Sequence, residues 1–127
     1  MPMLKLVFNI RRRSDVEPDE FYRYWKDEHG PLVRSVAEVL GIRRYVQSHT
    51  IETPINDALR ASRNTEPRFD GVAELWWDSV DDFVGRLADP AAQTASAALL
   101  EDEARFIDLE ATSIFLTEEH EIIPLLA

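Results

Sequence analysis

Four stretches of the chain predict β-strands. In residues 4–10, leucine, phenylalanine and isoleucine alternate with less apolar residues, the period of two expected of a strand with one buried side. Residues 42 to about 51 and about 108 to 117 alternate in the same way. Residues 71–77 form a short run of mainly apolar and aromatic residues. We therefore predict four strands, separated by helical patterns.

A long helical pattern lies between the first two strands. It begins at Pro18, which is followed by two acidic residues at the positive end of the helix dipole, and Gly41 ends it. Its apolar residues recur at helical spacing over residues 21–40, and His29 lies on the same stripe. Gly30-Pro31 interrupts this pattern, because proline lacks a backbone N–H, so we predict a kink or a restarted helix there.

Two further helical patterns follow the third strand. Ser79 is the predicted N-cap of the first, and Asp89-Pro90 begins an alanine-rich stretch that ends near Ala104. The connection of residues 52–68 is long, and residues 55–63 within it predict one or two helical turns. Connections of this length are usually lids, interface arms or mobile segments.

The order β-α-β-β-α-β predicts an α+β fold of the ferredoxin-like type, with a four-stranded antiparallel sheet and both helical regions on one face. The length fits a single domain, residues 1–127. We expect the uncovered face to carry Val7, Tyr45 and one of the two third-strand tryptophans, which is too apolar to face water. Two copies would then pack face to face as a homodimer, with the tail 118–127 reaching the partner.

The composition excludes several classes of function. Lys and Arg number 14 against 24 Asp and Glu, a net charge of −10, so we expect no nucleic-acid partner. Without cysteine there is no thiol nucleophile, disulfide or Cys-type zinc site. The apolar start, residues 1–8, is too short for a signal peptide, and no run approaches the roughly 18 apolar residues of a membrane span. We expect a cytoplasmic protein with no membrane partner.

Three segments resemble the EthD-domain family. The first-helix signature of that family, an aromatic residue, a Tyr-Trp-like pair and His-Gly-Pro, has a similar counterpart in residues 21–33 (Phe-Tyr-Arg-Tyr-Trp-Lys-Asp-Glu-His-Gly-Pro-Leu-Val). Its entry to the second strand resembles residues 41–45 (Gly-Ile-Arg-Arg-Tyr), and its third strand resembles residues 70–77 (Asp-Gly-Val-Ala-Glu-Leu-Trp-Trp). The resemblance implies a dimeric α+β barrel, in which two sheets face each other and each half holds a pocket.

Proteins with this barrel differ in chemistry. The family is named after an accessory protein of an ether-degradation gene cluster, and related barrels include muconolactone and methylmuconolactone isomerases, polyketide cyclases, and cofactor-free or haem-degrading monooxygenases. The haem-degrading relatives need a haem-ligating histidine in the second helical region, and residues 79–106 contain no histidine. We therefore expect no haem, and we expect no other cofactor and no metal ion.

His29 is the leading catalytic candidate. A neutral imidazole both takes and gives a proton near pH 7, which suits enolisation, lactone isomerisation and aldol cyclisation. In the methylmuconolactone isomerases that this chain resembles, a histidine at this motif position belongs to the active site. The alternative is a buried structural histidine that donates a hydrogen bond to a carbonyl after the helix break.

Tyr45 and His49 share one face of the second strand, with Gln47 between them. A phenol, an amide and an imidazole in a row can hold a carbonyl oxygen and shuttle a proton. The isomerases that this chain resembles also have a tyrosine at the position of Tyr45. The alternatives are ordinary packing of Tyr45 and a solvated His49.

The third strand departs from these isomerases, which place a cysteine where this chain has Leu75. Its neighbour Glu74 must be paired or have a raised pKa in an otherwise apolar strand, and we consider an arginine, a Trp N–H or His29 as partners. Trp76 and Trp77 should lie on opposite faces of the sheet. Asn9 on the first strand is a candidate hydrogen-bonding group in the pocket.

We expect a pocket that binds a small carbonyl-containing or aromatic compound. Its predicted lining is Val7, Asn9, Tyr45, Gln47 and a third-strand residue, with Glu74, Leu75 and Trp77 as the candidates. His29, Tyr45 and His49 would make the protein a cofactor-independent isomerase, cyclase or dehydratase of degradation or secondary metabolism. The alternatives are a non-catalytic accessory or binding protein and, with less support, a monooxygenase.

Overall fold

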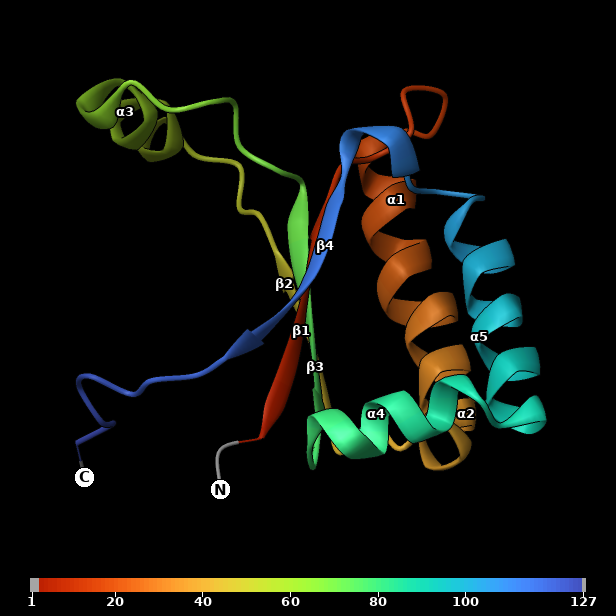
Figure 1. The fold of residues 1–127 in the computed structure, drawn as a ribbon. Helices are drawn as coiled ribbons and strands as arrows, with labels where there is room; N and C mark the ends of the chain where they lie inside the picture. The colour runs from red at the N-terminus through yellow and green to blue at the C-terminus, as the bar shows by residue number, and fades with distance from the viewer. Residues whose placement is uncertain (1–2, 127) are drawn as a thin grey trace.

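The computed structural model describes residues 3–126 (Figure 1). Met1 and Pro2, at the start of the stretch compared with a signal peptide, and Ala127, the last residue of the predicted tail, lie outside the described residues. The elements in chain order are β1 (Leu4–Ile10), α1 (Pro18–Tyr24), a π-helical turn (Trp25–His29), α2 (Gly30–Leu40), β2 (Arg44–His49), α3 (Pro54–Arg63), β3 (Gly71–Trp77), α4 (Val80–Leu87), α5 (Pro90–Glu103), a 3-10 turn (Leu109–Ala111) and β4 (Ser113–Glu118).

The strands form one antiparallel sheet in the order β2-β3-β1-β4. Helices α1, α2, α4 and α5 cover one face of the sheet, while α3 and the C-terminal tail extend from its other side (Figure 1). The predicted β-α-β-β-α-β order and the α+β, ferredoxin-like fold class are confirmed, with α3 as an additional helix in the long connection.

The pairing register shows which residues lie on the helix-covered face. Directly paired residues of neighbouring strands point to the same side of a sheet. Tyr45 pairs with Leu75, Leu75 pairs with Leu6, and all three pack against the core. The prediction that Tyr45 lies on the uncovered face is therefore wrong. Both sides of the second strand are similarly polar, so its pattern does not reveal which side is buried.

The opposite side, which we call the open face, carries Val7, as predicted, with Phe115 paired beside it. The two tryptophans lie on opposite sides, also as predicted. Trp77 faces the helices, where its ring makes an edge contact with Phe83. Trp76 lies on the open face, with the guanidinium of Arg44 over its ring. The sheet therefore separates two environments that differ in composition and in exposure.

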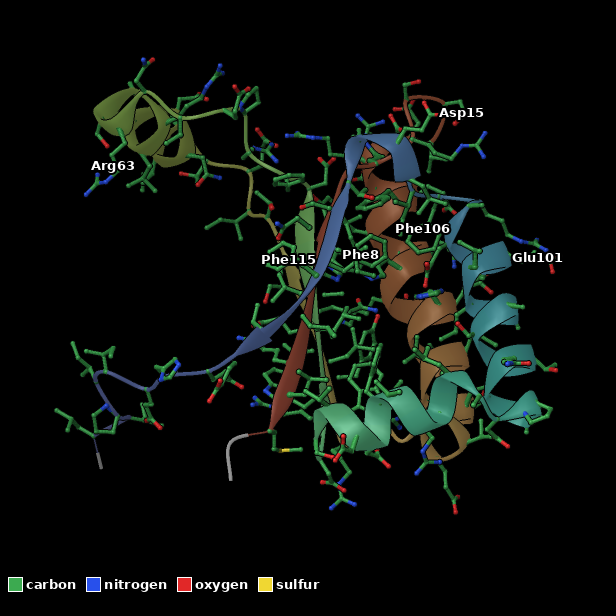
Figure 2. The ribbon with its side chains drawn as sticks, viewed as in Figure 1. Phe8, Asp15, Arg63, Glu101, Phe106 and Phe115 are labelled. Atoms are coloured by element: carbon green, nitrogen blue, oxygen red, sulfur yellow. The ribbon has the colours of Figure 1, made fainter. Side chains whose placement is uncertain are left out.

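The hydrophobic core fills the space between the sheet and the helices. Figure 2 shows Phe8 and Phe106 in this space, and Phe115 on the other side of the sheet. Two of the largest fully buried side chains, Trp25 and Phe21, come from the first helical region. The buried cluster consists of Phe8, Ile10, Phe21, Trp25, Ala73, Phe106 and Ile107.

The interruption predicted at Gly30-Pro31 takes the form of a wide turn inside a continuous helical segment. The backbone N–H of Gly30 donates to the carbonyl of Trp25, five residues earlier, which defines the π-helical turn at Trp25–His29. Pro31, which has no N–H to donate, is the second residue of α2, the regular helix that follows. Single π-helical turns within α-helices are often found at functional sites.

Trp25 packs directly on the backbone of β3 at Gly71. A Cβ atom added at Gly71 would lie 2.5 Å from the indole ring of Trp25 and 2.7 Å from the carbonyl oxygen of Ser48. The backbone of Gly71 has no positive φ, so the requirement for glycine here is one of space. The Trp25 ring therefore lies directly against the backbone of β3, with no room for a side chain between them.

We predict that Gly71→Ala destabilises the protein by about 1–3 kcal/mol, the usual cost of overpacking a core. Gly85 on α4 is a matched control, because nothing lies within 4 Å of a Cβ added there. Gly85→Ala should stabilise the helix by up to about 1 kcal/mol, since alanine has the higher helix propensity. Urea unfolding of both variants measures the difference, and equal effects would contradict this account of Gly71.

The remaining elements differ from the predictions mainly at their ends. β4 begins at Ser113 and not near residue 108, because a 3-10 turn occupies Leu109–Ala111. The helical turns predicted for residues 55–63 form α3, a complete helix with no buried residue. Within residues 3–126, no helix has the length and apolar composition needed to cross a bilayer.

Candidate active site

His29 lies at the end of the π-helical turn and is 4% exposed. Its Nδ1 is 2.7 Å from the Oδ2 atom of Asp102, in the last turn of α5. The hydroxyl of Tyr24 donates to the other carboxylate oxygen of Asp102, and this hydrogen bond contributes most to raising the pKa of Tyr24 to about 12. The imidazole ring is therefore held by a carboxylate that is itself held by a phenol.

Glu103, the next residue of α5, lies on the other side of the same imidazole. Its Oε2 atom is 3.9 Å from His29 Nε2, which is a charge contact and not a hydrogen bond. Burial raises the pKa of Glu103 to about 7, and the negative charge of Asp102 acts in the same direction. This carboxyl group therefore exchanges its proton near neutral pH.

Burial has the opposite effect on His29, whose pKa is lowered because the charged imidazolium loses its hydration. The hydrogen bond to Asp102 and its charge oppose this shift without cancelling it. A neutral ring donates its Nδ1–H to Asp102, so the lone pair of Nε2 faces Glu103. The shifts reverse the ordinary order of the two groups, because the pKa of Glu103 is raised to about 7 and that of His29 is lowered from its ordinary value of 6.5.

Tyr45, Gln47 and His49 form a hydrogen-bonded row on the helix-covered face of β2. Gln47 Nε2 donates to Tyr45 Oη at 2.9 Å and to the Trp25 carbonyl at 2.8 Å. His49 Nε2 lies 2.8 Å from Gln47 Oε1, and its ring stacks on the indole of Trp25 at 4.5 Å. The predicted row is therefore present, and it is anchored to the π-helical turn.

The direction of each hydrogen bond in this row can be assigned. The amide nitrogen of Gln47 has two acceptors, so its carbonyl oxygen must accept from the Nε2–H of His49. Tyr45 Oη accepts from Gln47, which leaves the phenolic proton available for another acceptor. Burial raises the pKa of Tyr45, so the group remains a neutral donor. The pKa of His49 is lowered by burial and by the charge of Lys26.

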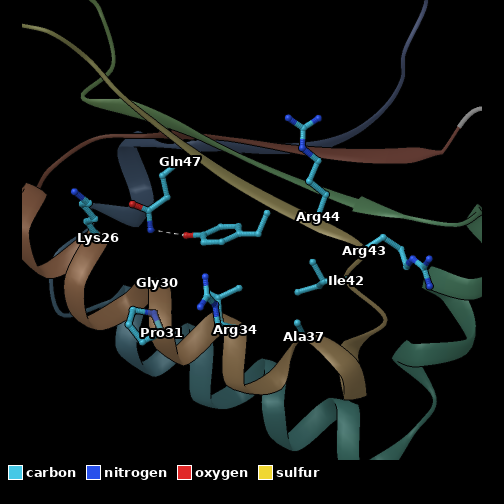
Figure 3. Close-up of a pocket in the computed structure, with 11 residues that line it drawn as sticks. Lys26, Gly30, Pro31, Arg34, Ala37, Ile42, Arg43, Arg44 and Gln47 are labelled. Carbon is cyan, nitrogen blue, oxygen red and sulfur yellow. Dashed lines mark hydrogen bonds between the residues drawn. The ribbon is translucent and has the colours of Figure 1, made fainter.

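A groove of about 500 Å³ lies between β2 and α2 (Figure 3). Tyr45 and Gln47 form part of its wall, and their hydrogen bond is drawn in Figure 3. His29 is not among the lining residues, but its chain neighbour Gly30 is. The negative charge of Glu103 also contributes to raising the pKa of Tyr45. The tyrosine is therefore the side chain that the groove and the buried Glu103 share.

The predicted pocket residues divide between the two faces of the sheet. Leu75 is paired with Tyr45 on the helix-covered face. Asn9 and Glu74 lie on the open face, where Asn9 donates to Ser113 Oγ at 3.1 Å and Glu74 forms a 2.7 Å ion pair with Lys5. The prediction that Asn9 and Glu74 share a pocket with Tyr45 and Gln47 is wrong, because the sheet lies between them.

The same separation excludes Val7 from the predicted pocket, because it shares the open face with Glu74, its partner across the strands. Trp77 lies on the helix-covered face but does not line the groove. Its indole N–H donates to the carbonyl of Leu40 at 2.7 Å, which holds the end of α2 against the sheet. Its role in the described structure is that of a core residue.

Sequence reasoning did not identify Asp102 and Glu103 as site residues. One signal was available: these two consecutive acids end an alanine-rich helix, where the dipole disfavours negative charge. An exposed acidic pair would have looked the same, so the signal does not reveal that both groups are directed at His29. Within residues 3–126, no group of three or more histidine and acidic side chains is arranged to hold a metal ion.

A comparison with known protein families identifies the domain that contains the candidate site. The EthD domain model matches residues 13–110, a segment that contains the π-helical turn, β2, β3 and the acidic end of α5. The chain belongs to the EthD-domain family. Among curated proteins, no significant match to this EthD-domain chain was found.

Solved structures resemble this EthD-domain protein over most of its length. Hydroxynitrile lyase from Passiflora edulis is 13% identical with a TM-score of 0.63, covering 97% of this chain and 98% of its own. SnoaB, a cofactor-independent oxygenase from Streptomyces nogalater, is 14% identical with a TM-score of 0.57, covering 98% and 100%. A dimeric protein of unknown function and ferredoxin-like fold from Bacteroides fragilis is 13% identical with a TM-score of 0.57, covering 92% and 96%. At these identities the similarity shows a shared fold.

The raised pKa of Glu103 predicts an unusual dependence of stability on pH. The unfolded chain loses this proton near the ordinary value of 4.5, whereas the folded protein keeps it until about pH 7, so stability falls as pH rises between these values. Glu103→Gln should remove this loss and be more stable than the native protein by on the order of 2 kcal/mol at pH 8, but not at pH 4.

Urea unfolding between pH 4 and pH 8 measures this difference. Glu101→Gln is the matched control, because the Glu101 side chain is 79% exposed on the same helix. The control should follow the native protein at every pH. A constant gap between Glu103→Gln and the native protein across the range would contradict the burial of a titrating carboxyl group.

Proposed function

We propose that this EthD-domain protein is a cofactor-independent acid–base enzyme, an isomerase, cyclase or dehydratase, that acts on a small carbonyl-containing or aromatic compound. The observation that carries this proposal is the pair His29 and Glu103, two buried groups 3.9 Å apart, of which the carboxyl has a raised pKa and the imidazole a lowered one. Pairs with such shifts are typical of sites that move protons at neutral pH. The names of two structural neighbours, a lyase and a cofactor-independent oxygenase, are consistent with chemistry on this fold.

In this proposal Tyr45 binds the carbonyl group of the substrate. Its free phenolic proton points away from Gln47 and is donated to the carbonyl oxygen, which stabilises the enolate-like charge that develops there. His49 is a positioning residue, because its Nε2–H fixes the orientation of the Gln47 amide and thereby the donor direction of Tyr45.

The proton released from the carbon next to the carbonyl is accepted by the carboxylate of Glu103. His29 presents its Nε2 lone pair on the side of Glu103 as a second proton acceptor, and Asp102 holds the imidazole in the required tautomer. Return of the proton to a different carbon atom gives isomerisation. Its transfer to a hydroxyl group on the neighbouring carbon, which leaves as water while a C=C bond forms, gives dehydration. Neither sequence of steps needs an oxidant or an added cofactor.

We predict that His29→Gln lowers turnover by about 10²-fold or more, since general acid–base groups contribute 10²–10⁴-fold. Tyr45→Phe, which removes one hydrogen-bond donor, should lower it by about 10²–10³-fold. Proton NMR in D₂O over a panel of small ketones, lactones and aryl methyl ketones, all of which carry hydrogen on the carbon next to the carbonyl group, measures exchange at that carbon. His120→Gln, on the exposed tail, is the control and should leave the rate unchanged.

Equal rates in folded His29→Gln and in the native protein would exclude the acid–base assignment. If no compound in the panel exchanges although one binds in the groove, the alternative function, that of a non-catalytic binding protein, is favoured.

We also propose that the working unit is a homodimer built through the open face. Phe115 on this face is 47% exposed, and the apolar side chains of α3 and of the tail are among the most exposed of the chain. Both segments extend from the same side of the sheet (Figure 1). One structural neighbour of the same fold is described as dimeric. A second copy would cover these side chains, and the tail 118–127 would pack on it.

The expected mass in solution is therefore twice 14.6 kDa. Phe115→Glu should give a monomer, because it places a charge in the proposed interface. Leu100→Glu, at a 56% exposed position on the outer side of α5, is the matched control and should remain dimeric. Size-exclusion chromatography with light scattering distinguishes the two, and a native protein of 14.6 kDa would exclude the dimer.

A further inference from the structure

The charges at the groove contrast with those of the whole chain. The protein carries a net charge of −10, yet every charged residue that lines the groove between β2 and α2 is a cation, and no acidic residue lines it. These cations are Lys26, Arg34, Arg43 and Arg44. Four basic residues of a predominantly acidic chain therefore line one cavity, and three of them have side chains that are not directed to the open face.

Within residues 3–126, three of these cations, Lys26, Arg34 and Arg44, have no carboxylate oxygen within 4.0 Å. The fourth, Arg43, lies 3.6 Å from Asp78. Arg44 is directed to the open face, where it stacks on Trp76. Figure 3 shows Arg34 reaching from α2 toward β2, with Lys26 at one end of the groove. The positive charge of Lys26 and Arg34 is therefore available to a ligand.

The rest of the lining suits a compact apolar body. The groove has an aliphatic surface formed by Val33, Ala37 and Ile42, and the ring of Tyr45 adds a flat aromatic surface. A cavity of about 500 Å³ is within the range of small-molecule sites, roughly 300–1,000 Å³. Besides the cations, the phenolic proton of Tyr45 is available in this wall as a neutral hydrogen-bond donor.

We propose that the groove selects a small organic carboxylate with a flat, apolar body, held by Arg34 and Lys26 through its carboxylate. This inference rests on the proposed function and names the substrate class of the same site. Guanidinium binds carboxylate through two parallel hydrogen bonds, which orients a planar ligand as well as attracting it. A carbonyl group elsewhere on the same ligand can then reach Tyr45.

Benzoate and its neutral analogue benzamide are the probes, titrated into ¹⁵N-labelled protein and followed by NMR. Benzoate should shift the amide signals of Val33, Ala37 and Ile42 with a Kd in the low millimolar range, and benzamide should bind several-fold more weakly. Arg34→Gln should weaken benzoate binding by about tenfold and leave benzamide unaffected. Added salt should weaken benzoate binding only.

Arg63→Gln on α3 is the control, since Arg63 is exposed and does not line the groove. Equal binding of benzoate and benzamide, equal losses in the Arg34 and Arg63 variants, or no benzoate shift at the groove would each overturn the proposal.

The outcome is separable from that of the proposed catalysis. If benzoate binds at the groove but no compound in the exchange panel reacts, the catalytic proposal fails and the carboxylate site stands. If neutral carbonyl compounds exchange but benzoate does not bind, the catalysis stands and this substrate class fails.

Discussion

The contact of Trp25 with β3 determines where the site residues lie. The indole ring occupies the space left by the missing side chain of Gly71, and His49 stacks on it from the neighbouring strand. The carbonyl of the same tryptophan accepts from Gln47, so the ring and the backbone of one residue both attach the π-helical turn to the sheet. Four residues further along, this turn ends at His29, which faces the acidic end of α5.

The local elements were predictable because their signals are local. The bounds of β1 and β3, the helix starts at Pro18 and Pro90, and the end at Gly41 follow from periodicity, proline and glycine alone. The row on β2 was also predictable, since alternation requires its members to share a face. The sequence could not show which face of the sheet these residues occupy, because the two sides of β2 differ little in polarity. Only the pairing of β2 with β3 determines which side faces the helices.

The partners of His29 depend on contacts between residues more than 70 positions apart. No spacing rule connects the end of α5 to the π-helical turn, and the packing of α5 beside α2 places them together. The same packing removes Glu103 from water and so creates its altered acidity. The sheet therefore separates two regions: the titratable groups of the candidate site lie between the sheet and the helices, and the open face is the one that we propose for dimerisation.

The π-helical turn has a consequence for how the chain tolerates changes in length. Each residue of an α-helix advances by about 100° around the helix axis. The extra residue in the π-helical turn therefore rotates the side chains of α1 about this axis relative to those of α2. Deleting one residue there would restore a regular helix and swing Phe21 and Trp25 away from the strands while Val33 stayed in place. A one-residue deletion at this point should therefore destabilise the core, although no single side chain in the turn reveals the constraint.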